Sequence, residues 1–156
     1  MSHFTLEEFV RSDKARARGI VNALPLNLVP AAEDTLAMLE RIRAFLGERA
    51  GCEVPMALSS GYRCPALNWA VRNPKAGPGS DATGDHPRAR AADWTAPAFG
   101  SPLDVCRALA PHADDLGIGQ LIYEGGWVHT STALPLRPIN RIITAKAGGY
   151  VPGIVA

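Results

Sequence analysis

The segment from Thr83 to Trp94, TGDHPRARAADW, constrains the fold more than any other because it sets a carboxylate in apolar surroundings. Asp93 follows two alanines and precedes a tryptophan, in a stretch that predicts a buried strand. An ionised carboxylate in such a strand is costly unless it is paired or bound to a cation. We therefore expect Asp93 to have a charged partner or a bound ion.

His86 lies seven residues before Asp93 and is a candidate to share such an ion. Seven residues separate two Cα atoms by roughly 23 Å on a straight strand and by roughly 10 Å on a helix. Tetrahedral zinc needs donor atoms only about 3.3 Å apart. The two side chains can share an ion only if the chain doubles back, and Pro87 in the loop HPRAR provides a place for that reversal.

A second histidine follows in a predicted hairpin, GQLIYE and WVHTS around the turn Gly125–Gly126. A two-residue turn places Glu124 opposite Trp127 and Ile122 opposite His129. Glu124 and His129 then share one face of the sheet as diagonal neighbours, with Cα atoms roughly 7–8 Å apart. This distance suits a carboxylate that contacts a water held on a metal beside it, so Glu124 is our candidate general base.

Two histidines and one carboxylate leave a coordination position for water, which is the pattern of catalytic rather than structural zinc. A water bound in this way ionises near neutral pH, and the metal also polarises a carbonyl, so a hydrolase follows. The same donor set forms the facial triad of iron(II) oxygenases. The six-residue gap between His86 and Asp93 and the lack of a jelly-roll strand pattern argue against that alternative.

Size and charge narrow the class of protein further. The chain has 156 residues, 47% of them apolar, which suits one compact domain over residues 1–156. A formal net charge of +1 provides no broad positive field, so we expect no nucleic-acid partner and no anionic membrane partner. Three scattered cysteines exclude a full disulfide framework. We expect a monomer.

The pattern of helices first and short strands later predicts an α+β domain with a small, mainly antiparallel sheet and flanking helices. Thr5 and Glu8 form a capping box for a short helix with a basic tail that ends at Gly19, and an apolar stripe between Pro30 and Gly51 predicts the longest helix. The other predicted elements are a strand within 54–63, a helix at 65–72, a loop over 73–85, a strand at 90–94, a helix at 101–113, the hairpin over 119–131 and a last strand at 140–146.

Three motifs, SSGYRCPALN, GDHPRARAAD and WVHTS, occur in this order along the chain. Together they resemble the zinc D-alanyl-D-alanine peptidases of family M15, and above all its short phage-like branch, whose N-terminus the segment FTLEEFVRSDKARARGIVNALP also resembles. The resemblance implies that His86, Asp93 and His129 are zinc ligands and that Arg63 holds the carboxylate or carbonyl of the substrate. It also implies the small α+β fold shared by these peptidases and the hedgehog signalling domain.

The implied activity is zinc-dependent hydrolysis of peptidoglycan peptides at a bond involving a D-amino acid. The enzyme would be a D-Ala-D-Ala carboxypeptidase or a phage endolysin-like endopeptidase, with peptidoglycan or a muropeptide as its partner. Besides Arg63, we assign Ser60, Tyr123 and Trp127 to substrate binding. The first ten residues lack the features of a signal peptide, and no apolar run is long enough to span a membrane. We expect synthesis in the cytoplasm, with phage lysis or a virion as a route to the cell wall.

The chain departs from the family motif at three positions. In the family this segment has the motif SxHxxGxAxD. Gly84 stands where the motif has serine, and Ala89 stands where it has glycine. Many relatives have an acidic residue three positions before the last histidine, where this chain has Gly126. Gly126 favours a second hypothesis, that of a murein-binding or phage structural module without activity, in which the zinc is structural.

Overall fold

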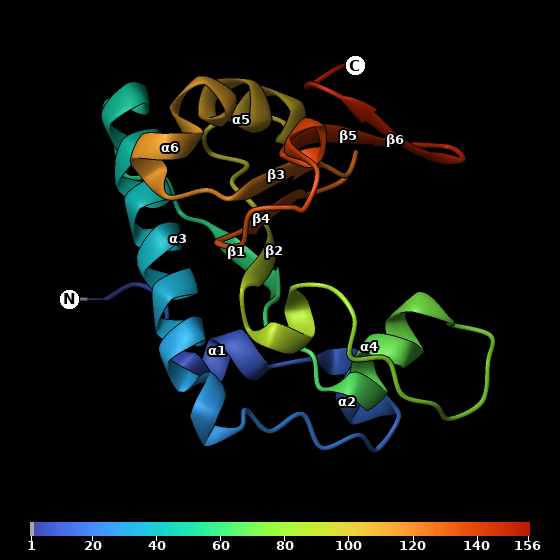
Figure 1. Ribbon diagram of the computed structural model, residues 1–156. Coiled ribbons are helices and arrows are strands. Elements are labelled where there is room, and N and C mark those ends of the chain that lie inside the picture. The colour runs from blue at the N-terminus through green and yellow to red at the C-terminus, as the bar shows by residue number, and fades with distance from the viewer. Residues whose placement is uncertain (1) are drawn as a thin grey trace.

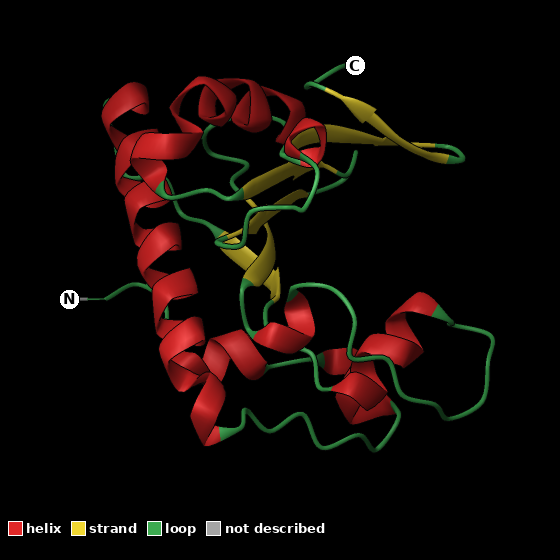
Figure 2. Ribbon diagram, viewed as in Figure 1, coloured by secondary structure: helices red, strands yellow, loops and turns green. Residues whose placement is uncertain are grey.

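The computed structural model describes residues 2–156, which form a six-stranded sheet with helices beside it (Figures 1 and 2). The strands are β1 (Ala57–Ser60), β2 (Ala91–Thr95), β3 (Gln120–Tyr123), β4 (Val128–Ser131), β5 (Ile142–Lys146) and β6 (Gly149–Pro152). The helices are α1 (Leu6–Val10), α2 (Asp13–Ala17), α3 (Val29–Ala50), α4 (Pro65–Arg72), α5 (Pro102–Leu109) and α6 (Ala113–Leu116), with 3-10 turns η1 (Leu26–Leu28), η2 (His86–Arg88), η3 (Ala110–His112) and η4 (Pro138–Asn140).

The sheet has the strand order β1-β2-β4-β3-β5-β6. Every neighbouring pair is antiparallel except β3 and β5, which are parallel. The predicted α+β class with a mainly antiparallel sheet and flanking helices is therefore confirmed. No helix within residues 2–156 is long and apolar enough to cross a membrane.

Helix α3 runs along one side of the molecule and provides much of the apolar core (Figure 1). It ends at Gly51, whose φ of 69° is the left-handed conformation that glycine adopts at little cost. Helix α6 packs on α3, and α5 packs on β3 and β4. The fully buried side chains of this core include Phe9, Leu39, Trp94, Leu109 and Leu121.

Successive side chains of strands β2 and β4 point alternately into this core and to the opposite face of the sheet. Trp94 points into the core, where its Nε1–H donates a hydrogen bond to Thr130 Oγ1 at 3.0 Å. The neighbouring residue Asp93 pairs directly with His129 across the two strands. Because successive side chains on a strand point to opposite faces, Asp93 and His129 lie together on the face away from Trp94.

Three predictions at helix ends were wrong in detail. The basic segment after α1 is a separate helix, α2, because the Ser12 hydroxyl accepts a hydrogen bond from the Ala15 N–H and starts a new helix. At α1, the Thr5 side chain accepts from the Glu8 N–H, which is only one half of the predicted capping box. The helix predicted over 101–113 divides into α5, η3 and α6, since Pro111 lacks the N–H that a continuous helix needs.

The strand predicted over 140–146 forms as β5, but it is not the last strand. The chain turns through Gly148, with a φ of 89°, and returns as β6. The resulting hairpin extends from the edge of the sheet (Figure 1). The strand predicted within 54–63 is limited to β1, whereas the predicted helix at 65–72 and the loop over 73–85 are confirmed.

Gly61, directly after β1, lies against α1, and a Cβ at this position would overlap the ring and the carbonyl oxygen of Phe9. We expect Gly61→Ala to lower the free energy of unfolding by about 2 kcal/mol or more, because neither group can move without disturbing the core. At Gly77 an added Cβ meets nothing within 4 Å, so Gly77→Ala should change the free energy of unfolding by less than about 0.5 kcal/mol. Urea denaturation measures both values, and equal stabilities would contradict the packing of α1 on β1.

Candidate functional site

Asp93 lies at the centre of a buried polar cluster on the face of the sheet away from the core. Its side chain is only 9% exposed, and three other side chains reach it. Oδ2 accepts from Arg63 Nη2 at 2.5 Å and lies 3.3 Å from His86 Nε2, while Oδ1 lies 2.8 Å from His129 Nδ1. The expectation that Asp93 would have a charged partner is confirmed by Arg63.

His86 reaches Asp93 because the chain reverses within residues 85–90. The turn contains η2 and ends at Ala89, whose φ of 56° is left-handed. An alanine in this conformation costs about 1 kcal/mol relative to glycine, the residue of the family motif. The Ala89 N–H donates to the His86 carbonyl at 3.1 Å, and the Ala89 carbonyl accepts from Thr35 Oγ1 at 2.9 Å. These bonds hold the turn, and the predicted doubling back is confirmed.

The orientation of the His86 ring is set by the turn after β1. His86 Nδ1 lies 2.6 Å from the carbonyl oxygen of Gly61. Because a carbonyl only accepts hydrogen bonds, Nδ1 carries the proton and Nε2 keeps its lone pair. Burial lowers the pKa of His86 and so favours the neutral ring. A neutral imidazole whose other nitrogen is held by a carbonyl is the usual form of a metal-binding histidine.

His86, Asp93 and His129, hereafter the His–Asp–His group, are together suited to hold a metal ion. One donor atom from each side chain lies within 4.8 Å of the other two, and no other such group occurs within residues 2–156. The two separations to the Asp93 oxygens, 3.3 and 2.8 Å, are close to the spacing of donors around tetrahedral zinc. Burial opposes charge on Asp93, but the two imidazoles outweigh it and hold the pKa of this carboxyl well below its usual range.

Arg63 and Ser60 form one side of the site. Arg63 Nε donates to Ser60 Oγ at 2.9 Å, and Nη2 donates to Asp93, so the guanidinium is held at two of its three nitrogens. The third, Nη1, makes no hydrogen bond within the described residues. Arg63 lines the pocket, but Ser60 does not. Ser60 therefore orients Arg63, and its predicted contact with the substrate stays a prediction.

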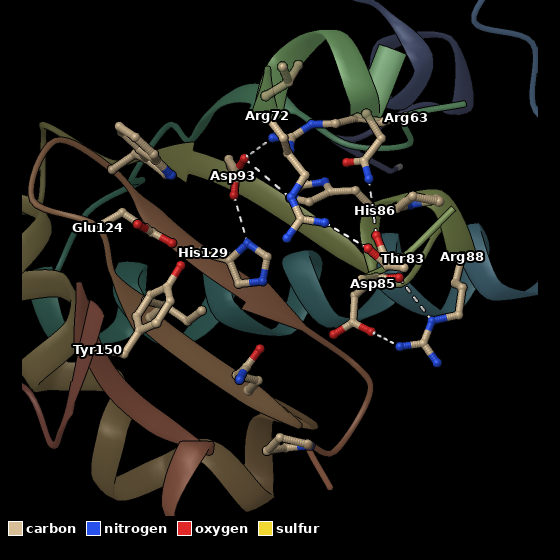
Figure 3. A pocket seen from close by; sticks show the side chains of 18 of the residues that line it. Arg63, Arg72, Thr83, Asp85, His86, Arg88, Asp93, Glu124, His129 and Tyr150 are labelled. Carbon is tan, nitrogen blue, oxygen red and sulfur yellow. Dashed lines mark hydrogen bonds and ion pairs between the residues drawn. The ribbon is translucent and has the colours of Figure 1, made fainter. Parts of the chain in front are cut away.

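A cavity of about 620 Å³ lies in front of the His–Asp–His group (Figure 3). The three side chains of the His–Asp–His group line this cavity, together with Arg63, Glu124, Trp127 and Tyr150. The cavity is large enough for a short peptide, since ligand pockets in proteins span about 300–1,000 Å³.

Glu124 reaches the cavity through the hairpin register that the sequence predicts. Ile122 pairs with His129, and the Glu124 N–H donates to the Trp127 carbonyl at 3.1 Å, so Glu124 and His129 share a face. Burial, helped by the negative charge of Asp93, raises the pKa of Glu124, while His129 and Arg63 act in the opposite direction. Tyr123 is not brought to the cavity, because strand alternation turns its ring to the other face, where it packs on the core.

The pocket residues that sequence reasoning did not assign to the site include Arg72 and Tyr150. Arg72 lies at the end of α4 and donates to Asp81 and Thr83 at 2.7 Å, so it joins the 73–85 loop to the pocket rim. Tyr150 is on β6, the strand that was not predicted. The glycine pair that precedes it in KAGGYVP is a hairpin signal that points to this strand.

The donor set, its burial and the cavity in front of it define a candidate metal centre of the hydrolytic class. The family model for Peptidase M15 matches residues 2–131. The chain therefore belongs to the Peptidase M15 family of metallopeptidases, and a peptide is the type of substrate that follows. No curated protein and no solved structure gives a significant match.

Substitution of Asp93 tests how far the stability of the buried cluster depends on its one negative charge. In the presence of a chelator, we expect Asp93→Ala to lower the free energy of unfolding by about 3–5 kcal/mol, because Arg63 is left buried without its partner. Asp114 pairs with Arg141 at 2.6 Å but is 87% exposed, so Asp114→Ala should cost less than about 1 kcal/mol. Guanidinium denaturation compares the two, and similar losses would count against a buried charge network.

Proposed function

We propose that the protein is a zinc-dependent peptidase that hydrolyses peptidoglycan peptides at a bond involving a D-amino acid. The observation that carries this proposal is the His–Asp–His group at the wall of a peptide-sized cavity, in a chain of the Peptidase M15 family. A D-Ala-D-Ala carboxypeptidase and an endolysin-like endopeptidase are the two forms of this activity that the motifs support.

The donor set supports zinc ligation by His86 Nε2, a carboxylate oxygen of Asp93 and His129 Nδ1. Neutral imidazoles and a carboxylate are ligands that zinc accepts, and the Gly61 carbonyl already holds His86 in the tautomer that leaves Nε2 free. Zinc bound there supplies a water that ionises near neutral pH and polarises the scissile carbonyl.

Glu124 is the proposed general base. It takes a proton from the attacking water while the new C–O bond forms, and it returns a proton to the amine nitrogen as the C–N bond breaks. Its place on the same face as His129 and its raised pKa support this role, since a carboxyl with a raised pKa both accepts and returns a proton more readily near neutral pH.

Arg63 is the proposed anchor for the substrate. Its Nη1 is the guanidinium nitrogen that the described residues leave without a hydrogen bond, and it belongs to a pocket-lining side chain fixed by Ser60 and Asp93. A carboxylate at the end of a peptide, or a carbonyl within it, is a suitable acceptor for such a donor. Trp127, on the cavity wall, offers an apolar surface to the rest of the substrate.

Removing a proposed ligand should abolish both metal binding and activity. We expect His86→Ala to lose stoichiometric zinc and to stop cleaving muropeptides, whereas His112→Ala keeps both, because His112 lies outside the group. Metal analysis of protein purified without added ions and mass spectrometry of muropeptide digests, with and without chelator, measure the two properties. Stoichiometric iron with oxygen uptake, or cleavage that survives in metal-free protein, would refute the zinc mechanism.

Replacing the proposed base should slow the reaction without loss of metal. We expect Glu124→Gln to lower kcat by about 100-fold or more while zinc affinity stays within a few-fold, because the amide cannot accept the proton. The matched control is Glu53→Gln, at an exposed residue paired only with Arg43 on the surface. Steady-state kinetics and zinc titration check the split, and full activity in Glu124→Gln would assign the base elsewhere.

The second hypothesis, a murein-binding or phage structural module with a structural zinc, rests on Gly126 at the position that is acidic in many relatives. The same digest separates the two hypotheses. A binding module retains the muropeptide without shortening it, whereas a peptidase releases fragments of lower mass.

A further inference from the structure

Tyr150 shares one row of the sheet with the proposed base. Strands β3 and β5 pair Tyr123 with Thr144, so the next position along the parallel register sets Glu124 beside Ala145. Strands β5 and β6 then pair Ala145 with Tyr150. Side chains at paired positions lie on the same face, which places Glu124, Ala145 and Tyr150 in a row on the face of the metal-binding group.

The middle residue of this row, Ala145, is small and leaves space for the side chain of Tyr150 to extend toward Glu124. Glu124 and Tyr150 are two strands apart, or about 10 Å between Cα atoms. Ala145 fills little of that gap, so the phenol ring leans across it toward the cavity. Figure 3 shows the Tyr150 hydroxyl pointing toward Glu124 and His129.

The hydroxyl is placed as a donor that still lacks an acceptor. It makes no hydrogen bond within residues 2–156, although it lines the cavity in front of the His–Asp–His group. Burial, together with the nearby charge of Glu124, raises the pKa of Tyr150, so the hydroxyl keeps its proton at neutral pH. The residue as a whole is 58% exposed, so part of it faces solvent. A group of this kind is available to a bound ligand.

We propose that the Tyr150 hydroxyl donates a hydrogen bond to the carbonyl oxygen of the scissile peptide as that oxygen gains negative charge. The inference rests on the proposed peptidase function. Tyr150 retains its proton throughout, so the bond forms and breaks with the charge on the oxygen and consumes nothing. Tyr150 approaches from the β6 edge of the sheet, whereas Arg63 approaches from the β1 edge. The two donors therefore meet the substrate from opposite sides.

The segment that carries Tyr150 lies beyond the stretch matched by the family model, which ends at Ser131. Strands β5 and β6 thus add a donor to a site whose other polar groups all lie within residues 60–131. Oxyanion donors of this kind contribute by their fixed position, because a preorganised donor needs no reorientation during the reaction.

The variant Tyr150→Phe removes the hydroxyl and keeps the ring. With a muropeptide that the wild-type protein cleaves, we expect kcat to fall about 100-fold with KM changed by less than about threefold. Zinc affinity by titration calorimetry and the thermal midpoint should match the wild type. Tyr150→Leu should lose activity to the same extent, and Tyr62→Phe, at a buried residue that does not line the cavity, should remain fully active.

A transition-state analogue separates charge stabilisation from ordinary substrate contact. A phosphinate analogue of the cleaved dipeptide carries the negative oxygen, whereas the product peptide does not. We expect Tyr150→Phe to weaken the inhibition constant of the phosphinate in proportion to the loss of kcat/KM, and to leave product binding unchanged.

Several outcomes would overturn the inference. Unchanged kcat in Tyr150→Phe would show that the hydroxyl plays no part, and equal weakening of phosphinate and product would make Tyr150 a general binding surface. Loss of zinc affinity would make it a positioning residue for the metal group. If the wild type cleaves no muropeptide, the proposed function fails and this inference fails with it. Cleavage by both proteins at equal rates removes the inference alone.

Discussion

The buried charge of Asp93 is the constraint on which the rest of the structure depends. Its carboxylate is held by a guanidinium after β1, an imidazole in η2 and another on β4, so three segments distant in sequence meet at one side chain. Burying this carboxylate without partners would cost free energy, and any one partner alone would offset only part of that cost. The register of β1, β2 and β4 and the reversal at residues 85–90 therefore stabilise each other. The arrangement that neutralises the charge also brings the donors of a candidate metal site together.

The turn that carries His86 shows how the fold tolerates local strain for this purpose. Ala89 takes a left-handed conformation that costs about 1 kcal/mol in an alanine, and Thr35 on α3 bonds its carbonyl. Helix α3 thus reaches beyond the core to fix the turn. Strain that the surrounding structure holds in place is common at functional sites. The turn takes this left-handed conformation with alanine at the position where the family motif has glycine.

Local sequence patterns were sufficient to predict much of the site. The features that depend on long-range packing could not be predicted in this way. The glycine pair at 125–126 fixed the hairpin register, and this register alone placed Glu124 on the face of His129. The same alternation puts Tyr123 on the other face of the sheet, where it packs on the core. The place of Ser60 depends on a register shift between Leu58 and Ser60 at the β1–β2 pairing, which no local pattern reveals. Tyr150 was missed because β6 is short and is stabilised as a strand by its pairing with β5.

The distribution of roles across the sheet suggests how activity and selectivity are separated. Asp93 and His129 lie on strands that have neighbours on both sides, where a shift of register would disturb the whole sheet. The side chains that face the cavity without contacting the cluster, such as Trp127 and Leu136, lie on a turn and on a loop. Changes at such positions cost little stability. A chain with this architecture can therefore alter which peptide it accepts while the donors around Asp93 stay in place.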